Sequence, residues 1–137
     1  MPGRMTVLAA AIVLMPLIAA CGSSSTTPTT PTQTTETFTG TVNQNSAATT
    51  TFGTTTSGAV TATLTSLAPV ATVQIGFALG TWDGSACQVV IVNPRATTGS
   101  QLGANASTKG TYCVHLYDIG QITADSPVSY TLTVVHP

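Results

Sequence analysis

Hydrophobic and polar residues alternate along much of this chain. Within residues 111–118, the side chains of Tyr112, Val114 and Leu116 point to one side, and those between them point to the other. A period of two residues is typical of a β-strand with one buried face. A second alternating run covers residues 128–136 after a polar connection. We expect these two runs to pair as antiparallel neighbours at the centre of a β-sheet domain.

Short alternating or apolar runs recur between turn residues, and no helical period of useful length is present. They predict seven strands, at residues 38–43, 49–52, 59–67, 70–79, 87–92, 111–118 and 128–136. This spacing favours an all-β fold, an antiparallel β-sandwich of the jelly-roll-like kind. We expect one face of the fourth strand to supply most of the core, through Ala71, Val73, Ile75, Phe77 and Leu79.

Turn residues mark the ends of several predicted strands. Asp83-Gly84 lies between two apolar runs and predicts a hairpin. Pro69 and Pro127 suit strand margins, because proline cannot donate a hydrogen bond to a sheet. Residues 101–109 indicate a mobile polar loop that has room for one more short strand near Leu102.

The low content of charged residues limits the kinds of molecule that this protein could bind. Charged residues make up 5% of the chain, far below the roughly 25% of an ordinary soluble domain. Threonine is abundant, and its β-branched side chain favours strands over helices. Beyond residue 20, two cations and four carboxylates give a formal net charge of −2: Arg95 and Lys109 against Glu36, Asp83, Asp118 and Asp125. No basic patch is present to neutralise phosphates, which excludes nucleic acid as a partner.

The N-terminal residues have the pattern of an export signal. A short positive segment, residues 1–4, precedes an apolar run of fourteen residues at 5–18. A membrane-spanning helix needs about 20 residues, so this run fits a secretory signal that ends at the small residues Ala19-Ala20. Two alternatives remain, namely an ordinary signal that leaves Cys21 in the mature protein and an uncleaved membrane helix.

The run Ile18-Ala19-Ala20-Cys21 resembles the lipobox of bacterial lipoproteins. The resemblance implies a signal peptide at residues 1–20, cleaved before Cys21, and a diacylglyceryl group on the Cys21 thiol. The protein would then be extracytoplasmic and anchored to the bacterial membrane by its acyl chains, which include palmitate. Gly22 stands where an aspartate would resemble the retention signal of the inner membrane, so the outer membrane is favoured if the organism has one.

The chain then divides into a tether and a domain. Residues 21–37 comprise the lipidated cysteine and a segment rich in Ser, Thr and Pro, which has no apolar periodicity and is expected to be extended and solvated. Residues 38–137 form the predicted β-sandwich domain. The tether would space this domain away from the lipid surface.

Three cysteines are present, and lipidation of Cys21 leaves Cys87 and Cys113 as an even pair. In an oxidising compartment we expect these two to form a disulfide. The alternation places Cys87 on one face with Val89 and Ile91, whereas Cys113 shares its face with polar neighbours. The bond must therefore span a bulge, or the second face of that sheet must be more buried than its pattern suggests.

Parts of the domain resemble the bacterial pre-peptidase C-terminal (PPC-like) family. That family closes with a Gly-x-Tyr strand and a Tyr-x-Leu strand, as in Gly110-Thr-Tyr-Cys-Val and Ser129-Tyr-Thr-Leu-Thr-Val134. Gly58-Ala-Val-Thr-Ala-Thr-Leu64 is similar to its earlier strand, which also begins at a glycine. Thr49-Thr50-Thr51 stands where the family has an acidic pair, so no calcium site is implied. The resemblance implies a jelly-roll-like accessory module without catalysis of its own.

No cluster of catalytic or metal-binding residues is visible in the sequence. His115 and Asp118 are three apart on one strand and point to opposite faces. His136 is expected to be solvated, and no Gly-x-Ser-x-Gly motif is present. Asp83, Asp118 and Asp125 are spaced as turn formers. We therefore expect no enzyme activity, no metal and no cofactor.

Trp82 and Asp83 are the candidate binding residues, because they lie at the predicted hairpin tip. An exposed indole there could stack on a sugar ring or on an apolar protein surface. The alternative is that Trp82 folds back over the edge of the sandwich. The expected function is a structural or protein-interaction module at the cell envelope, with envelope proteins as partners. The alternative function is a carbohydrate-binding module that uses Trp82 and the turn at 83–85 to bind glycans.

Overall fold

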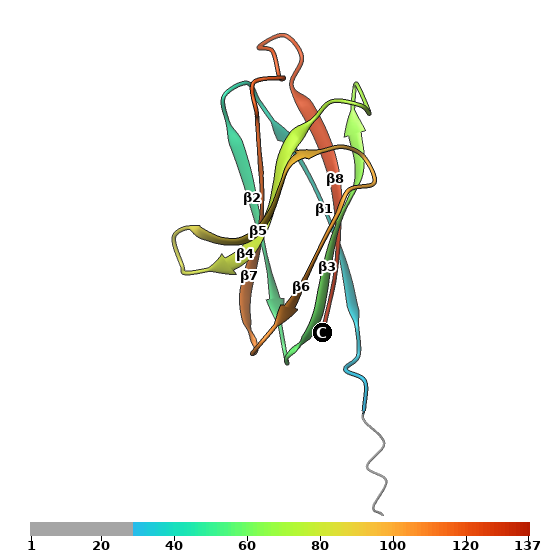
Figure 1. The fold of residues 1–137 in the computed structure, drawn as a ribbon, viewed down its shortest axis with the longest axis vertical. Helices are drawn as coiled ribbons and strands as arrows, with labels where there is room; N and C mark the ends of the chain where they lie inside the picture. The colour runs from blue at the N-terminus through green and yellow to red at the C-terminus, as the bar shows by residue number, and fades with distance from the viewer. Residues whose placement is uncertain (1–28) are drawn as a thin grey trace, which may run out of the picture.

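Eight β-strands form two antiparallel sheets in the computed structural model, which describes residues 29–137 (Figure 1). Their bounds are β1 Thr34–Val42, β2 Ala47–Thr54, β3 Gly58–Ala68, β4 Ile75–Trp82, β5 Cys87–Ala96, β6 Gln101–Ala106, β7 Gly110–Tyr117 and β8 Val128–His136. The first sheet has the order β1-β8-β3-β6, and the second has the order β2-β7-β4-β5. The chain passes between the two sheets in the strand order of a jelly roll. The predicted all-β sandwich is confirmed, with eight strands where the sequence indicated seven.

The bounds of β7 and β8 agree with the alternating pattern, but the predicted pairing of these two strands is wrong. β7 lies between β2 and β4 in the second sheet, and β8 lies between β1 and β3 in the first. Their buried faces meet across the core, where Val114 and Leu116 of β7 and Leu132 and Val134 of β8 are 0–1% exposed. Alternation indicates that each strand has a buried face, but it does not distinguish a neighbour in the sheet from one in the opposite layer.

Three segments differ from the sequence-based expectation. Residues 101–106 form strand β6, which pairs with β3 and buries Leu102 and Ala106, so the additional short strand near Leu102 is present within the segment that was expected to be mainly a loop. β1 begins at Thr34, four residues before the predicted start, because its register with β8 runs from Thr34 opposite His136. β4 begins only at Ile75, because residues 70–74 form the connection that follows Pro69.

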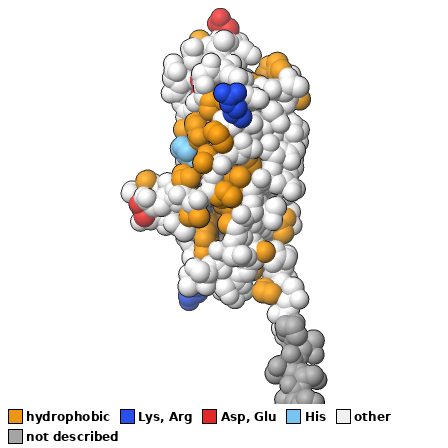
Figure 2. Space-filling view, viewed as in Figure 1, with side chains coloured by type: hydrophobic (Ala, Val, Ile, Leu, Met, Phe, Trp, Pro, Cys, Tyr) orange, Lys and Arg blue, Asp and Glu red, His pale blue; other side chains and the backbone are white. Residues whose placement is uncertain are grey.

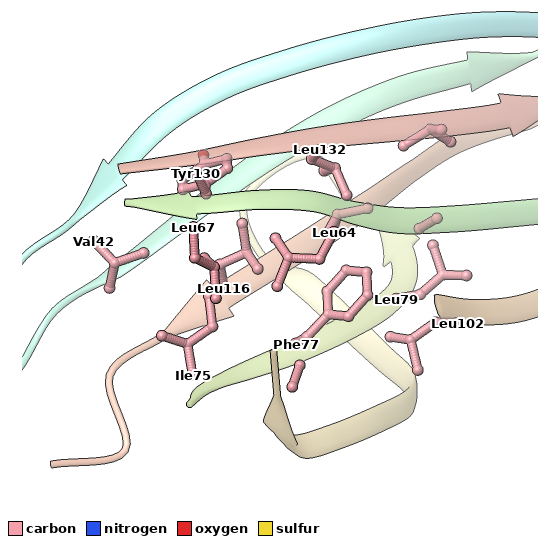
Figure 3. Packing of buried hydrophobic residues seen from close by; sticks show 14 of the residues in the cluster. Val42, Leu64, Leu67, Ile75, Phe77, Leu79, Leu102, Leu116, Tyr130 and Leu132 are labelled. Carbon is pink, nitrogen blue, oxygen red and sulfur yellow. The ribbon is translucent and has the colours of Figure 1, made fainter. Parts of the chain in front are cut away.

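The core fills the space between the sheets. Its largest side chains come from four strands and are almost completely buried (Figure 3); they are Phe77, Leu64, Ile75, Leu79, Leu116 and Leu132. Three of the five core residues predicted in one run, at positions 75, 77 and 79, are buried as expected. Ala71 is instead exposed and Val73 only half-buried, because they precede the strand.

β4 is buried on both faces from Ile75 to Gly80, and two glycines make this possible. A β-carbon at Gly76 would collide with the ring of Tyr117, which lies over the outer face of the second sheet. A β-carbon at Gly80 would collide with the carbonyl oxygen of Gln88 in β5. The register between β4 and β5 shifts beside Gly80, as in a β-bulge. The backbone of β5 there occupies the space that a side chain at position 80 would need.

A disulfide joins Cys87 of β5 to Cys113 of β7, with a Cα–Cα distance of 5.7 Å. These strands are not neighbours, because β4 lies between them and pairs Gly80 with Cys113. The start of β5 therefore lies over the outer face of the sheet, where Gly80 leaves room. Both explanations left open by the sequence apply, since a bulge adjoins the bond and Cys113 is 0% exposed.

Candidate functional site

The β4–β5 hairpin arm, defined here as residues 81–88, projects from the side of the sandwich (Figure 1). Its turn is organised by the carboxylate of Asp83. Oδ1 accepts hydrogen bonds from the backbone N–H of Ser85 (2.8 Å), the Ser85 hydroxyl (3.0 Å) and the backbone N–H of Ala86 (2.8 Å), and Oδ2 accepts one from the Gln88 amide (2.7 Å). The backbone N–H groups of Ala86 and Ser85, followed by the side-chain donors, lower the pKa of Asp83 well below its usual value.

Trp82 lies at the base of this turn, where its register partner in β5 is Cys87. Its side chain is half-buried, so it is neither a fully exposed platform nor a completely buried plug. Because Asp83 already accepts four hydrogen bonds within the arm, little of its capacity remains for a ligand. The structure thus brings the two candidate binding residues to one projecting tip, but the carboxylate there serves the turn.

Asp118 has the same kind of role at the end of β7. Its Oδ1 accepts hydrogen bonds from the backbone N–H groups of Gly120, Gln121 and Ile122, and its Oδ2 accepts one from Asn45 in the β1–β2 turn. Burial raises the pKa of Asp118, but the four N–H donors outweigh it and the net pKa lies below its usual value. The side chain fixes two connections at the same end of the sandwich.

The two histidines make separate contacts in different sheets. His115 contacts the Thr49 hydroxyl at 2.8 Å through Nδ1 on the outer face of the second sheet. His136 contacts Glu36 Oε1 at 2.7 Å through Nε2 and packs against the ring of Phe52. The expectation that His136 is solvated is wrong, because its residue is 3% exposed. His136 lies on the buried face of β8, together with Leu132 and Val134.

Within residues 29–137, the hydrogen-bond partners of the two histidines are Thr49, the carbonyl of Pro137 and Glu36, and none of them is an aspartate or a serine. Across residues 29–137, no cluster of three or more His, Cys, Asp or Glu side chains could hold a metal ion. In the same part of the chain every buried side-chain nitrogen or oxygen has a hydrogen-bond partner. No helix within it is long and apolar enough to cross a bilayer.

Four of the five exposed large hydrophobic residues of the described chain, residues 29–137, lie on β5, and the sequence analysis missed their exposure. Val89, Val90, Ile91 and Val92 are 50%, 70%, 37% and 47% exposed. β5 is an edge strand, and on its outer side no other strand of residues 29–137 is paired with it. Figure 2 shows hydrophobic side chains gathered in a band on the face where β5 lies. We call residues 89–92 the β5 apolar edge. Pro94 was the available signal, since proline within a strand indicates a sheet edge.

An apolar groove adjoins this edge where the two sheets open between β5 and β6. Its volume is about 230 Å³, and Val90 forms part of its wall. The other hydrophobic lining residues come from both sheets; they are Val60, Leu79, Ala104, Ala106 and Tyr112. Val90 therefore belongs both to the β5 apolar edge and to the wall of the groove.

The proposed lipidation site, Cys21, and the signal peptide lie outside the residues that the structure describes. No protein-family model matches this chain, and no curated protein sequence matches it.

Proposed function

We propose that this protein is a lipid-anchored extracytoplasmic protein whose β-sandwich is a non-catalytic interaction module, and that its contact surface is the β5 apolar edge. The observation that carries this proposal is the exposure of four consecutive β-branched aliphatic residues on an edge strand. Edge strands are normally protected by charges, prolines or covering segments, because their unpaired backbone groups can pair with another chain.

The compartment is supported by the cysteines. The Cys87–Cys113 disulfide suggests an oxidising, extracytoplasmic location. The lipid anchor is supported by the signal-like residues 1–20 and by Cys21 directly after them. Two or three acyl chains at Cys21 would hold the protein on a membrane, since each buried CH₂ contributes about 0.8 kcal/mol. The outer membrane is the proposed location if the organism has one.

The free energy that a partner could gain by covering the β5 apolar edge follows from the exposed fractions of its side chains. The exposed parts of the four side chains together equal about two whole aliphatic side chains. Full burial of one such side chain contributes roughly 1.5–3 kcal/mol. Because the side chains of a strand alternate between its two faces, a partner on one face would cover about half of this exposed surface and contribute on the order of 1.5–3 kcal/mol before the entropy of association is subtracted. A surface of this strength suits a contact with protein.

The polar residues support a non-catalytic role. The carboxylates of Asp83 and Asp118 are occupied by turn hydrogen bonds, and His136 is enclosed beside Glu36. A general acid or base must reach the proton that it transfers in a bound substrate. These groups instead face the protein itself.

Site-specific photo-crosslinking in intact cells tests the contact surface. A photo-reactive amino acid at Val90 should give discrete crosslinked protein bands, because this side chain is 70% exposed in the apolar edge. The matched control is the same amino acid at Val70, which is 53% exposed but lies in the β3–β4 connection. Equal crosslinking at both positions, or none at Val90, would remove the proposed contact surface.

Labelling with radioactive palmitate tests the anchor. The wild-type chain should incorporate the label and fractionate with membranes, whereas Cys21→Ser should do neither. Cys21 is the residue at issue, so the matched control is Ser24→Ala in the same segment, which should behave as wild type. Retention of the label in Cys21→Ser would contradict the anchor.

A carbohydrate-binding module is the second candidate, because Trp82 lies on an arm that projects from the sandwich (Figure 1). A half-buried indole still offers part of a ring face for stacking on a sugar. A glycan array probed with the full chain would then show retention that Trp82→Ala abolishes. Retention that persists in Trp82→Ala, or no retention of either chain, would contradict this second candidate.

A further inference from the structure

The free edge of β5 is open to pairing only over a short window. At one end, Pro94 lacks a backbone N–H and Arg95 introduces a charge. At the other end, the Cys87–Cys113 disulfide holds the start of β5 over the outer face of the sheet. Between these ends, residues 88–93 carry no charge and expose their side chains, apart from the half-buried Asn93. The β-bulge opposite Leu79 and Gly80 lies within this window, and Val90 is the residue there that has no register partner in β4. A strand added here would have a defined length.

The two charges nearest to this window have opposite signs and lie at opposite ends. Arg95 is exposed near the end of β5, and Asp83 is exposed in the turn before its start. If two β5 strands pair in opposite directions, Arg95 of each copy lies beside the turn that carries Asp83 of the other. Pairing in the same direction would place like charges together. The charge pattern is therefore complementary to itself under a two-fold rotation.

We propose that β5 pairs in the antiparallel direction with β5 of a second copy of this chain, centred on Val90, so that two four-stranded sheets join into one of eight strands. This proposal rests on the proposed function, because it names the occupant of the β5 apolar edge. Val90 is the most exposed residue of the edge and, in this register, lies opposite Val90 of the second copy. The added strand also covers the mouth of the apolar groove, whose wall includes Val90.

This assembly closes at two copies. Each β5 edge is used by the other, so the same surface occurs on both sides of the contact and no pairing edge of β5 remains. The contact is confined to about six residues of each strand, which is small beside the roughly 1,600 Å² of a standard protein interface. We therefore expect a weak and reversible dimer, with a dissociation constant of about 1 µM or higher.

Charge substitutions at the two-fold axis test the pairing. Sedimentation equilibrium of the full chain in density-matched detergent, from about 1 to 300 µM, should show a monomer–dimer equilibrium. Val90→Lys and Val90→Glu should each raise the dissociation constant at least about a hundredfold, because each places two like charges opposite each other. A one-to-one mixture of these two variants should restore dimers, since lysine then faces glutamate. Val70→Lys should dimerise as wild type, because Val70 is an exposed valine (53%) that lies away from β5.

The outcomes separate this proposal from the one before it. A wild-type chain that stays monomeric, a Val90→Lys chain that still dimerises, or a mixture that stays monomeric would each overturn the β5–β5 pairing. If the chain is monomeric but photo-crosslinking at Val90 gives a product with a different protein, the self-pairing fails while the contact surface stands. If position 90 gives no crosslinked product at all, both fail together.

Discussion

Removal of the disulfide should destabilise the domain strongly, because the bond connects strands that are not neighbours in the sheet. Cys87 and Cys113 are 26 residues apart. In the chain-entropy model, opening a loop of this length costs about 3.5 kcal/mol of stability through the greater freedom of the unfolded chain. Domains of this size are stable by about 5–15 kcal/mol. The double substitution Cys87→Ala and Cys113→Ala should therefore remove a large part of the free energy of unfolding.

Urea unfolding of the full chain measures this loss with two signals. Circular dichroism reports on the two sheets, and fluorescence reports on the hairpin arm, because Trp82 is the single tryptophan of the chain. We expect the midpoint to fall and the m-value to rise, since the unfolded chain without a crosslink exposes more surface. The arm should also loosen before the sheets, so that fluorescence changes at lower urea than circular dichroism.

Wild-type protein in reductant is the control, and it should behave like the double variant. A loss of less than about 1 kcal/mol would refute the reasoning. So would fluorescence and circular dichroism transitions that coincide in both forms, because the bond would then contribute nothing to the position of the arm.

Three further predictions concern the remaining features. Gly80→Ala should lower the free energy of unfolding by about 2–4 kcal/mol in urea, because the added β-carbon would collide with the backbone of β5. Gly53→Ala is the control, because the space around Gly53 is open, and it should change stability by less than about 0.5 kcal/mol. Equal effects of the two substitutions would contradict the close contact between β4 and β5 at Gly80. Because the pKa of Asp118 is lowered in the folded state, the ionised side chain stabilises the fold at pH values above its unfolded pKa near 3.8, and this stabilisation is lost as the pH falls through its folded pKa. Asp118→Asn should therefore weaken the loss of thermal midpoint at acid pH, and an unchanged dependence of the midpoint on pH would contradict this prediction. His136→Ala should cost about 2–3 kcal/mol, since it removes a buried ring and its hydrogen bond to Glu36, whereas less than about 1 kcal/mol would indicate a solvated side chain.

The sequence predicted what local patterns can determine. Alternation placed β7 and β8 almost to the residue, and Asp83-Gly84 placed the β4–β5 turn. The cysteine count predicted the bond between Cys87 and Cys113. Each of these depends on neighbouring residues or on a pair that has no competitor.

The neighbours of each strand could not be predicted in this way. Tyr112 and Tyr130 lie in runs with the same alternation, yet their strands belong to different sheets. Likewise, the apolar run 89–92 looks the same in sequence whether a strand lies at the centre of a sheet or at its edge. Its exposure depends on the order of the strands, which is set by contacts between distant parts of the chain. Pro94 was the one local indication that β5 is an edge strand, and the exposure of residues 89–92 could be recognised only from the fold.

The strand order also constrains when this domain can fold. β7 and β8 are the central strands that join the other strands of their sheets, and both come after residue 109 in the chain. Until they emerge from the ribosome, β1 and β2 each lack their pairing strand, and neither layer can close. A jelly roll with such distant pairings folds slowly, on the order of milliseconds to seconds. A nascent chain of this kind cannot complete either sheet until its synthesis is nearly finished, so it would remain unfolded during the export proposed above.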